Sequence, residues 1–272
     1  MSFSLLTYNI LRGGAGREDA LASVIRASEA DLVVLQEATS PAVVARLAAS
    51  TGMAQWMARR GSSLAFMSRQ PVVSYRWRRP AWSQHAILEL VPQEGLTVFG
   101  VHLSAVHSNW AEWRRVREVR GLLTMAKVEG HEVQVLTGDF NTLAPGETLD
   151  LARLPARLRA VTWLTGRRIR WKTVALMLEA GYVDAFRLVE PDGRGYTFPT
   201  WDPHLRLDYA FMPARHAARL RSCRVLQPEH AGKASDHLPL EMSIESDQSL
   251  LKSWPATLCA GRIWAPRMNS QL

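Results

Sequence analysis

Two short apolar runs near the start of the chain each end in a polar side chain, and an amphipathic segment separates them. Residues 4–10 predict a strand, and residues 31–37 predict a second, buried strand that ends in a carboxylate. Between them, Leu21, Val24 and Ile25 recur at helical spacing. Because strand, helix, strand is the order of an α/β unit, the chain is predicted to begin an α/β domain.

The rest of the chain continues with short strands and a few helices. Further strands are predicted at residues 63–68, 72–77, 85–91, 96–104, 132–139, 207–212, 223–226 and 238–244. Helices are predicted at residues 41–49, ended by Gly52, at 109–128, and at 149–180 around a polar, glycine-containing middle. The strands from 63 to 104 follow one another without helices, so we expect an antiparallel segment there.

Length and composition favour one catalytic domain. The 272 residues are 47% hydrophobic and 21% charged, as in ordinary globular proteins. We expect a domain over residues 1–245 and a peripheral or poorly ordered tail at 246–272, where the apolar pattern fades. Cys223 and Cys259 form no disulfide framework, and no apolar run is long enough to span a bilayer, so we expect a cytoplasmic protein. A net charge of +8 favours encounters with anions.

Polar residues at strand ends are the candidates for chemistry, because α/β enzymes place their sites there. Asn9 ends the first strand and Glu37 the second. A carboxylate at the mouth of a buried strand is costly to desolvate, and a bound hard cation is one compensation. A solvated glutamate is the alternative. His102 ends another strand, as a proton donor or as an ordinary core histidine.

The segment Leu136-Thr137-Gly138-Asp139-Phe140-Asn141-Thr142 is the most specific signal. Gly138 permits a close approach of the backbone. Asp139 is suited to orient a water molecule, and the amide of Asn141 is suited to donate a hydrogen bond to a phosphate oxygen. The alternative is a turn closed by an Asp or Asn side chain. Near the end of the domain, Asp208 is the natural partner to fix the tautomer of His237, and Asp236 precedes that histidine.

Taken in order, six motifs closely resemble the endonuclease/exonuclease/phosphatase superfamily. They span nearly all of residues 1–245 and read Tyr8-Asn9-Ile10, Leu35-Gln36-Glu37, Val101-His102-Leu103, Gly138-Asp139-Phe140-Asn141, Leu207-Asp208-Tyr209 and Ser235-Asp236-His237. The resemblance implies an α/β fold, a four-layer α/β/β/α sandwich of two packed mixed sheets, with the site at one edge. It also implies hydrolysis of phosphate esters with Mg²⁺ or Mn²⁺.

The resemblance further implies a role for each candidate. Glu37 is expected to bind the metal, with Asn9 and Asp236 completing or supporting its environment. Asp139 is expected to position the attacking water and Asn141 to hold the phosphate.

The remaining roles concern protons. The pair Asp208 and His237 is expected to handle proton transfer or transition-state charge. His102 resembles the second histidine of the deoxyribonuclease I and sphingomyelinase branches, which protonates the leaving oxygen.

One position departs from the abasic-site endonucleases, which often carry an acidic residue two places after the first asparagine. Leu11 stands there, which puts a second carboxylate ligand and a DNA-repair role in question.

Substrate features are less specific. Arg12 is a candidate to contact a substrate phosphate, with a solvated loop arginine as the alternative, and Trp201 could stack on a base, pack on a head group or fill the core. Between Arg153 and Lys172 the chain carries Trp163, Trp171 and no acidic residue, but the basic side chains Arg153, Arg157, Arg159, Arg167, Arg168, Arg170 and Lys172. Three interpretations fit this segment equally: it binds a nucleic-acid backbone, it lies on an anionic membrane surface, or it is a solvated basic face.

The function predicted from the sequence is therefore a metal-dependent phosphodiesterase that acts on a phosphate-ester substrate. A DNA or RNA nuclease and a lipid or inositol phosphate hydrolase are the alternatives. A non-catalytic phosphate-binding module ranks below them, because such proteins usually lose a charged site residue and none is missing here. No obligate protein partner is expected.

Overall fold

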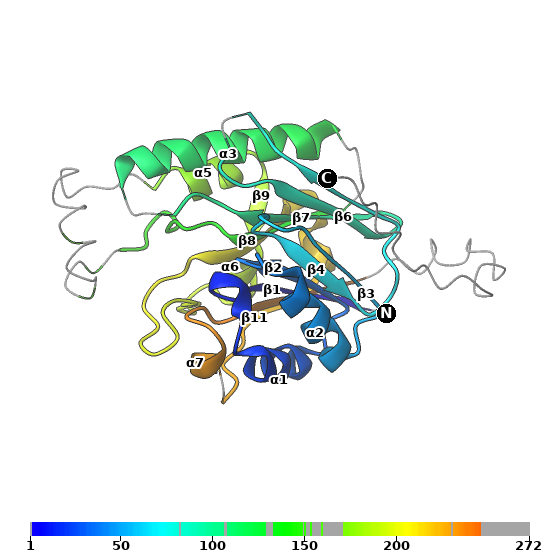
Figure 1. The fold of residues 1–272 in the computed structure, drawn as a ribbon. Helices are drawn as coiled ribbons and strands as arrows, with labels where there is room; N and C mark the ends of the chain where they lie inside the picture. The colour runs from blue at the N-terminus through cyan, green and yellow to red at the C-terminus, as the bar shows by residue number, and fades with distance from the viewer. Residues whose placement is uncertain are drawn as a thin grey trace.

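The computed structural model describes residues 2–81, 83–105, 108–128, 133–148, 171–229 and 231–245, with the single residues 150, 153 and 159. Two six-stranded sheets pack against each other, and helices cover their outer faces (Figure 1). The predicted four-layer α/β/β/α sandwich is confirmed. The predicted tail at 246–272 and most of the basic segment 153–172 lie outside the described residues.

The first sheet has the strand order β11-β12-β1-β2-β4-β3. Its strands are β1 (Ser2–Asn9), β2 (Leu32–Gln36), β3 (Gln55–Ala58), β4 (Ala65–Ser68), β11 (Leu220–Val225) and β12 (Leu240–Glu245). β1 and β2 run parallel with Asn9 beside Gln36, so both strands end at the same edge. Every residue of β2 is buried, as expected for a parallel strand covered on both faces.

The second sheet has the order β5-β6-β7-β8-β10-β9. Its strands are β5 (Ser74–Arg78), β6 (Ile87–Gln93), β7 (Leu96–His102), β8 (Val133–Asp139), β9 (Tyr182–Asp184) and β10 (Asp208–Pro213). β5, β6 and β7 are antiparallel, as predicted, whereas β7 and β8 are parallel. The register places Asp139 beside His102 on one side and beside Asp208 on the other.

Helices form the two outer layers. Figure 1 shows α1 (Glu18–Ser28), α2 (Pro41–Thr51) and α7 (Ala231–Ala234) on the first sheet, and α3 (Asn109–Val128) and α5 (Thr173–Glu179) on the second. The short α6 (Ala185–Val189) follows β9, and 3-10 turns lie at Arg12–Gly14 and Ala214–Arg219. α2 begins at a proline and ends at Gly52, which is left-handed as predicted.

Three apolar cores hold these layers together. The central core packs side chains of both sheets against one another, including Val34 and Phe66 from the first and Val98 and Val135 from the second. The other two cores lie between each sheet and its helices. This packing holds the strands in place, so the side chains at their ends lie on a rigid edge of the folded protein.

Some predicted elements differ from the structure. β3 and β9 were not predicted, because each is short and only half-buried, and its pairing partner rather than its own pattern makes it a strand. Of the helix predicted at 149–180, the described residues include α5 at its end, and the isolated described residue Arg159 is helical as well. None of the described helices combines the length and apolar content needed to cross a membrane.

Candidate active site

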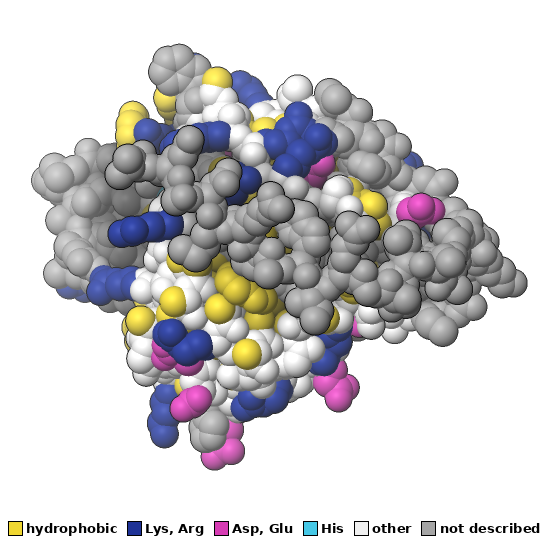
Figure 2. Space-filling model, turned by 45° about the vertical axis from the view of Figure 1, so that its right-hand side comes forward, with side chains coloured by type: hydrophobic (Ala, Val, Ile, Leu, Met, Phe, Trp, Pro, Cys, Tyr) yellow, Lys and Arg dark blue, Asp and Glu magenta, His cyan; other side chains and the backbone are white. Residues whose placement is uncertain are grey.

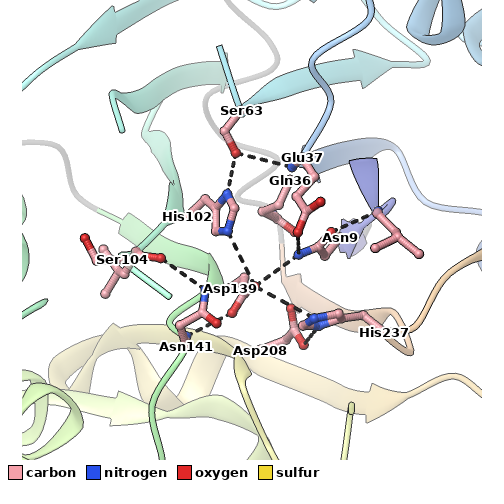
Figure 3. Close-up of polar contacts among 12 residues, drawn as sticks. Asn9, Gln36, Glu37, Ser63, His102, Ser104, Asp139, Asn141, Asp208 and His237 are labelled. Atoms are coloured by element: carbon pink, nitrogen blue, oxygen red, sulfur yellow. Dashed lines mark hydrogen bonds and ion pairs between the residues drawn. The ribbon is translucent and has the colours of Figure 1, made fainter. Parts of the chain in front are cut away.

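The polar residues predicted from the sequence meet at one edge of the sandwich, where strands of both sheets end (Figure 3). Asn9 is the last residue of β1, and Glu37 follows β2. His102 and Asp139 end β7 and β8, and Asp208 begins the antiparallel β10. Because both parallel pairs end at this edge, residues far apart in the chain are brought together.

Asn9 joins the two sheets. Its Nδ2 donates to Asp139 Oδ2 at 3.1 Å and to Glu37 Oε1 at 3.3 Å. Its Oδ1 accepts from the backbone N–H of Leu11 at 3.0 Å, which fixes the orientation of the amide. Asn9 is buried, so these contacts are held in a dry environment where hydrogen bonds to carboxylates are strong.

Glu37 is held by its own backbone and by the loop after β1. Its φ of 55° is left-handed, a strained conformation for a residue other than glycine. Oε2 accepts from the N–H of Arg12 at 2.6 Å, and the N–H of Glu37 donates to Ser63 Oγ at 3.3 Å. Backbone strain maintained by surrounding contacts is typical of functional positions, and here it directs a carboxylate into the site.

Asp139 lies at the centre of the cluster. Oδ1 accepts from the N–H of Asn141 at 2.9 Å, so only Oδ2 faces Asn9 and the two histidines. His102 Nε2 is 3.8 Å and His237 Nε2 is 3.9 Å from Oδ2. Burial raises the pKa of Asp139 to about 7, and the negative charge of Asp208 acts in the same direction.

His237 carries a positive charge at neutral pH. Burial alone lowers its pKa, but the carboxylate of Asp208, hydrogen-bonded to Nδ1 at 2.8 Å, outweighs that effect and raises the pKa to about 10. This contact fixes the proton on Nδ1 and directs Nε2 toward Asp139. The pairing of Asp208 with His237 that the sequence suggested is present as a hydrogen bond.

His102, in contrast to His237, is uncharged at neutral pH. Burial, followed by the positive charges that His85 and His237 can carry, lowers its pKa to about 3, so the ring is neutral. Its Nδ1 contacts the hydroxyl of Ser63, and its ring stacks on that of His85 with centroids 4.7 Å apart. Since Ser63 Oγ already accepts from Glu37, its proton is free to donate to Nδ1. The remaining ring proton is then on Nε2, which faces Asp139.

Negative charge is in excess at this edge, which fits a bound cation. Burial and the charge of Glu37 both raise the pKa of Asp236, a half-buried residue in the loop before β12. Asp139, Asp208 and His237 place ligand atoms within 4.8 Å of one another. However, Asp208 and His237 are engaged with each other, so the oxygen-rich side at Glu37 and Asp236 fits a hard divalent ion better.

The remaining candidates lie around this cluster. Asn141 is left-handed with a φ of 52°, and its Nδ2 donates to the carbonyl of Leu103 at 3.1 Å, which leaves its second N–H available. Arg12 is exposed beside Glu37. Trp201 is 74% exposed and contacts Phe198, whose ring lies 4.9 Å from that of His237. The sequence prediction that Trp201 could fill the core is wrong.

The geometry agrees with a comparison of the whole sequence. The model of the endonuclease/exonuclease/phosphatase family matches residues 6–237, which includes every one of the clustered side chains. The chain belongs to this family. A search of curated proteins finds no match.

Solved structures of the family share the fold. A 3′ phosphatase from Neisseria, bound to a product DNA hairpin, is 19% identical with a TM-score of 0.66, over 90% of this chain and all of that one. An AP endonuclease from Archaeoglobus fulgidus is 18% identical with a TM-score of 0.66 over the same shares. An endonuclease/exonuclease/phosphatase from Beutenbergia cavernae is 22% identical with a TM-score of 0.65, over 89% of this chain and 71% of that one.

Two side chains in the candidate active site of this protein were not predicted from the sequence. Ser63 and His85 both lie outside the six motifs, in loops that precede strands of different sheets. Neither stands in a pattern that separates it from ordinary loop residues. The pairing of β6 with β7 brings His85 beside His102, and the packing of the two sheets brings Ser63 there, so no short pattern in the sequence identifies either residue.

Gly138, in the motif at residues 136–142, lies where the neighbouring backbone leaves no room for a side chain. Its φ is 141°, and a Cβ added there would lie 2.0 Å from the carbonyl oxygen of Val101 on β7. Because that neighbour is backbone, we expect Gly138→Ala to destabilise the fold by about 3 kcal/mol or more. Urea unfolding checks this, with Gly146→Ala, where nothing lies within 4 Å of the added atom, as the control. Equal stability of the two variants would contradict the geometry.

Proposed function

We propose that this protein is a divalent-metal-dependent phosphodiesterase that uses water to cleave a phosphate ester. The observation that carries the proposal is the arrangement around Asp139 Oδ2, which a charged histidine and a neutral histidine both face at under 4 Å. Such a pair provides one group that stabilises negative charge and one that donates a hydrogen bond, and both assist the hydrolysis of a phosphodiester. Membership of the family supports the same reaction class.

The metal is expected to be Mg²⁺ or Mn²⁺, held by the carboxylates of Glu37 and Asp236. When bound, it would polarise a phosphoryl oxygen and neutralise charge on it. Asn9 directs N–H groups at Glu37 and Asp139, so we assign it to orienting these carboxylates rather than to direct ligation. Of the two roles expected for Asn9, completing or supporting the metal environment, the second is therefore proposed.

The protein's own groups would act as follows. Asp139 Oδ2 accepts a proton of the attacking water and orients it. The imidazolium of His237, kept charged by Asp208, stabilises the negative phosphoryl oxygens. His102 Nε2–H and the free N–H of Asn141 are placed to bind phosphoryl or leaving-group oxygens, and Arg12 and Trp201 to contact the parts of the substrate that lie further out.

A nucleic-acid substrate is the second candidate, because one structural neighbour is a 3′ phosphatase bound to a product DNA hairpin and another is an AP endonuclease. A lipid or inositol phosphate is the other alternative. We propose a cytoplasmic enzyme. An activity panel of bis-(p-nitrophenyl) phosphate, DNA, RNA, inositol phosphates and sphingomyelin decides the substrate class. Activity that survived both Glu37→Ala and His237→Ala would come from a contaminant or from another site.

Metal removal gives the first prediction on activity. Dialysis against EDTA is expected to abolish hydrolysis, and Mg²⁺ or Mn²⁺ to restore it. The same ions should raise the melting temperature of the wild type, since an ion that binds only the folded state stabilises it. Glu37→Ala should lose the thermal shift. Full activity in EDTA would contradict the proposal.

Ser63 is predicted to act by positioning His102. Ser63→Ala removes the partner of Nδ1 and frees the ring to rotate or to carry its proton on Nδ1, so we expect kcat to fall about 10- to 100-fold. KM should change little. Ser62→Ala, one residue away with its hydroxyl bonded to the carbonyl of Leu64, is the matched control. Equal rates for both variants would refute the role.

A further inference from the structure

The outer side of α3 displays aromatic and basic side chains that the active site does not use. Trp110 is 65% and Trp113 is 53% exposed, one helical turn apart. The guanidinium of Arg114 lies 4.8 Å from the centre of the Trp110 ring, and that of Arg117 lies 3.8 Å from that of Trp113. Exposed tryptophans are uncommon on a surface without a partner, so this side of the helix is a candidate binding surface.

The inner side of α3 holds the helix rigidly. Arg115 is fully buried, and its guanidinium donates to Glu112 at 2.9 Å and to the carbonyl of Ser104 at 2.7 Å. Glu118 is buried as well and accepts from Ser104. Both acidic residues of α3 therefore face inward. The side that faces solvent carries only cations, aromatics and neutral residues, so its charge is positive.

The start of α5 lies beside α3. Glu112 accepts from the backbone N–H of Lys172 at 2.6 Å, which places the start of α5 beside the first turn of α3. Lys172 itself is exposed. We define the α3 face by its members, which are Trp110, Trp113, Arg114, Arg117 and Arg120.

The α3 face lies at the same end of the molecule as the active site. Trp171, next to Lys172, packs on the apolar cluster of Leu143, Leu205 and Leu207, directly before Asp208. Figure 1 shows α3 in the outermost layer, and Figure 2 shows basic and apolar side chains together in the upper part of the molecule, the height at which α3 lies. A partner on this face would be held beside the site.

We propose that the α3 face docks this protein on an anionic phospholipid surface. Tryptophan favours the boundary between lipid and water, and arginine is attracted to anionic head groups. One face of each indole is already covered by its arginine, which reduces the area available for stacking bases and disfavours single-stranded nucleic acid.

A basic segment later in the chain agrees with a lipid partner. Residues 151–172, most of which lie outside the described part, contain no acidic residue and mix arginine with leucine, isoleucine and tryptophan. Large aliphatic residues among cations are typical of segments at lipid interfaces. The proposal concerns binding only, so it holds or fails independently of the substrate.

Vesicle flotation tests the proposal with the full chain. The wild type should bind vesicles of phosphatidylcholine with 30% phosphatidylglycerol, and pure phosphatidylcholine only weakly. The double variant Arg114→Gln/Arg117→Gln should lower partitioning about 30-fold. Trp110→Ala/Trp113→Ala should lower it at least about tenfold. All four side chains lie outside the cores, so unchanged melting temperatures are expected.

A matched control removes the same charge from the opposite layer. Arg26 and Arg46 are exposed on α1 and α2, and Arg26→Gln/Arg46→Gln should bind like the wild type. Failure of the wild type to bind anionic vesicles overturns the proposal, as does equal loss in the control. Binding of a single-stranded oligonucleotide that falls in the α3 variants, without vesicle binding, would assign the surface to nucleic acid instead.

Discussion

Asp139→Asn is expected to lower kcat/KM at least about 1,000-fold while the protein stays folded. Oδ2 of Asp139 is the single atom that Asn9, His102 and His237 all face. An asparagine keeps the shape and the bond to the N–H of Asn141, but it cannot take a proton. If it instead turns its NH₂ group toward these partners, it faces the donor of Asn9 and the charged ring of His237.

The measurement is kcat and KM on whichever substrate the panel identifies, with circular dichroism and thermal unfolding alongside. Asp192→Asn, on an exposed loop residue, loses the same charge away from the site and should retain full activity. If Asp139→Asn lost less than tenfold, Asp139 would not be the group that handles the water. The proposed reaction would then require another base.

Replacement of the imidazolium is predicted to have the second largest effect. His237→Ala removes the positive charge and is expected to lower kcat about 100- to 10,000-fold. Asp208→Asn keeps a partner for Nδ1 but removes the charge that raises the pKa of His237 above its ordinary value. We therefore expect a smaller loss at low pH and a larger loss at high pH.

The pH dependence of Asp208→Asn depends on the raised pKa of His237. In the wild type, His237 stays protonated until the pH approaches about 10. In Asp208→Asn, burial is no longer opposed by that carboxylate, so the ring deprotonates at lower pH and the rate falls earlier as pH rises. A pH–rate profile measures this. Identical profiles for the wild type and Asp208→Asn would show that the charge of His237 does not contribute.

The strand ends were the most predictable feature of the fold. A buried apolar run followed by a polar residue is visible in the sequence at β1, β2, β7 and β8, and all four end where that pattern predicts, within a residue or two. β3 and β9 were missed because their residues are half-buried and become strands only by pairing with β4 and β10. Such pairing depends on the whole sheet, so short windows of sequence do not contain it.

The residues of the candidate site were easier to predict from the sequence than their protonation states. Asn9, Glu37, Asp139, Asp208 and His237 were predicted as candidates because each lies at or within a few residues of the end or start of a strand. The opposite protonation of His102 and His237 has no counterpart in the sequence, since burial and the nearest charge decide it. Ser63 and His85 escaped detection for a related reason. Ser63 reaches His102 from the other sheet and His85 from the neighbouring strand β6, and neither residue stands in a motif.

The site is divided between two separately hydrogen-bonded sheets. Glu37 belongs to one, Asp139 and His102 to the other, and side-chain contacts such as the bond from Asn9 to Asp139 join them at this edge. A displacement of one sheet by a single strand position, about 3.4 Å, would separate these groups while every strand kept its backbone partners. Catalytic competence therefore depends on alignment between the layers, and heating should extinguish turnover before the β-structure signal declines.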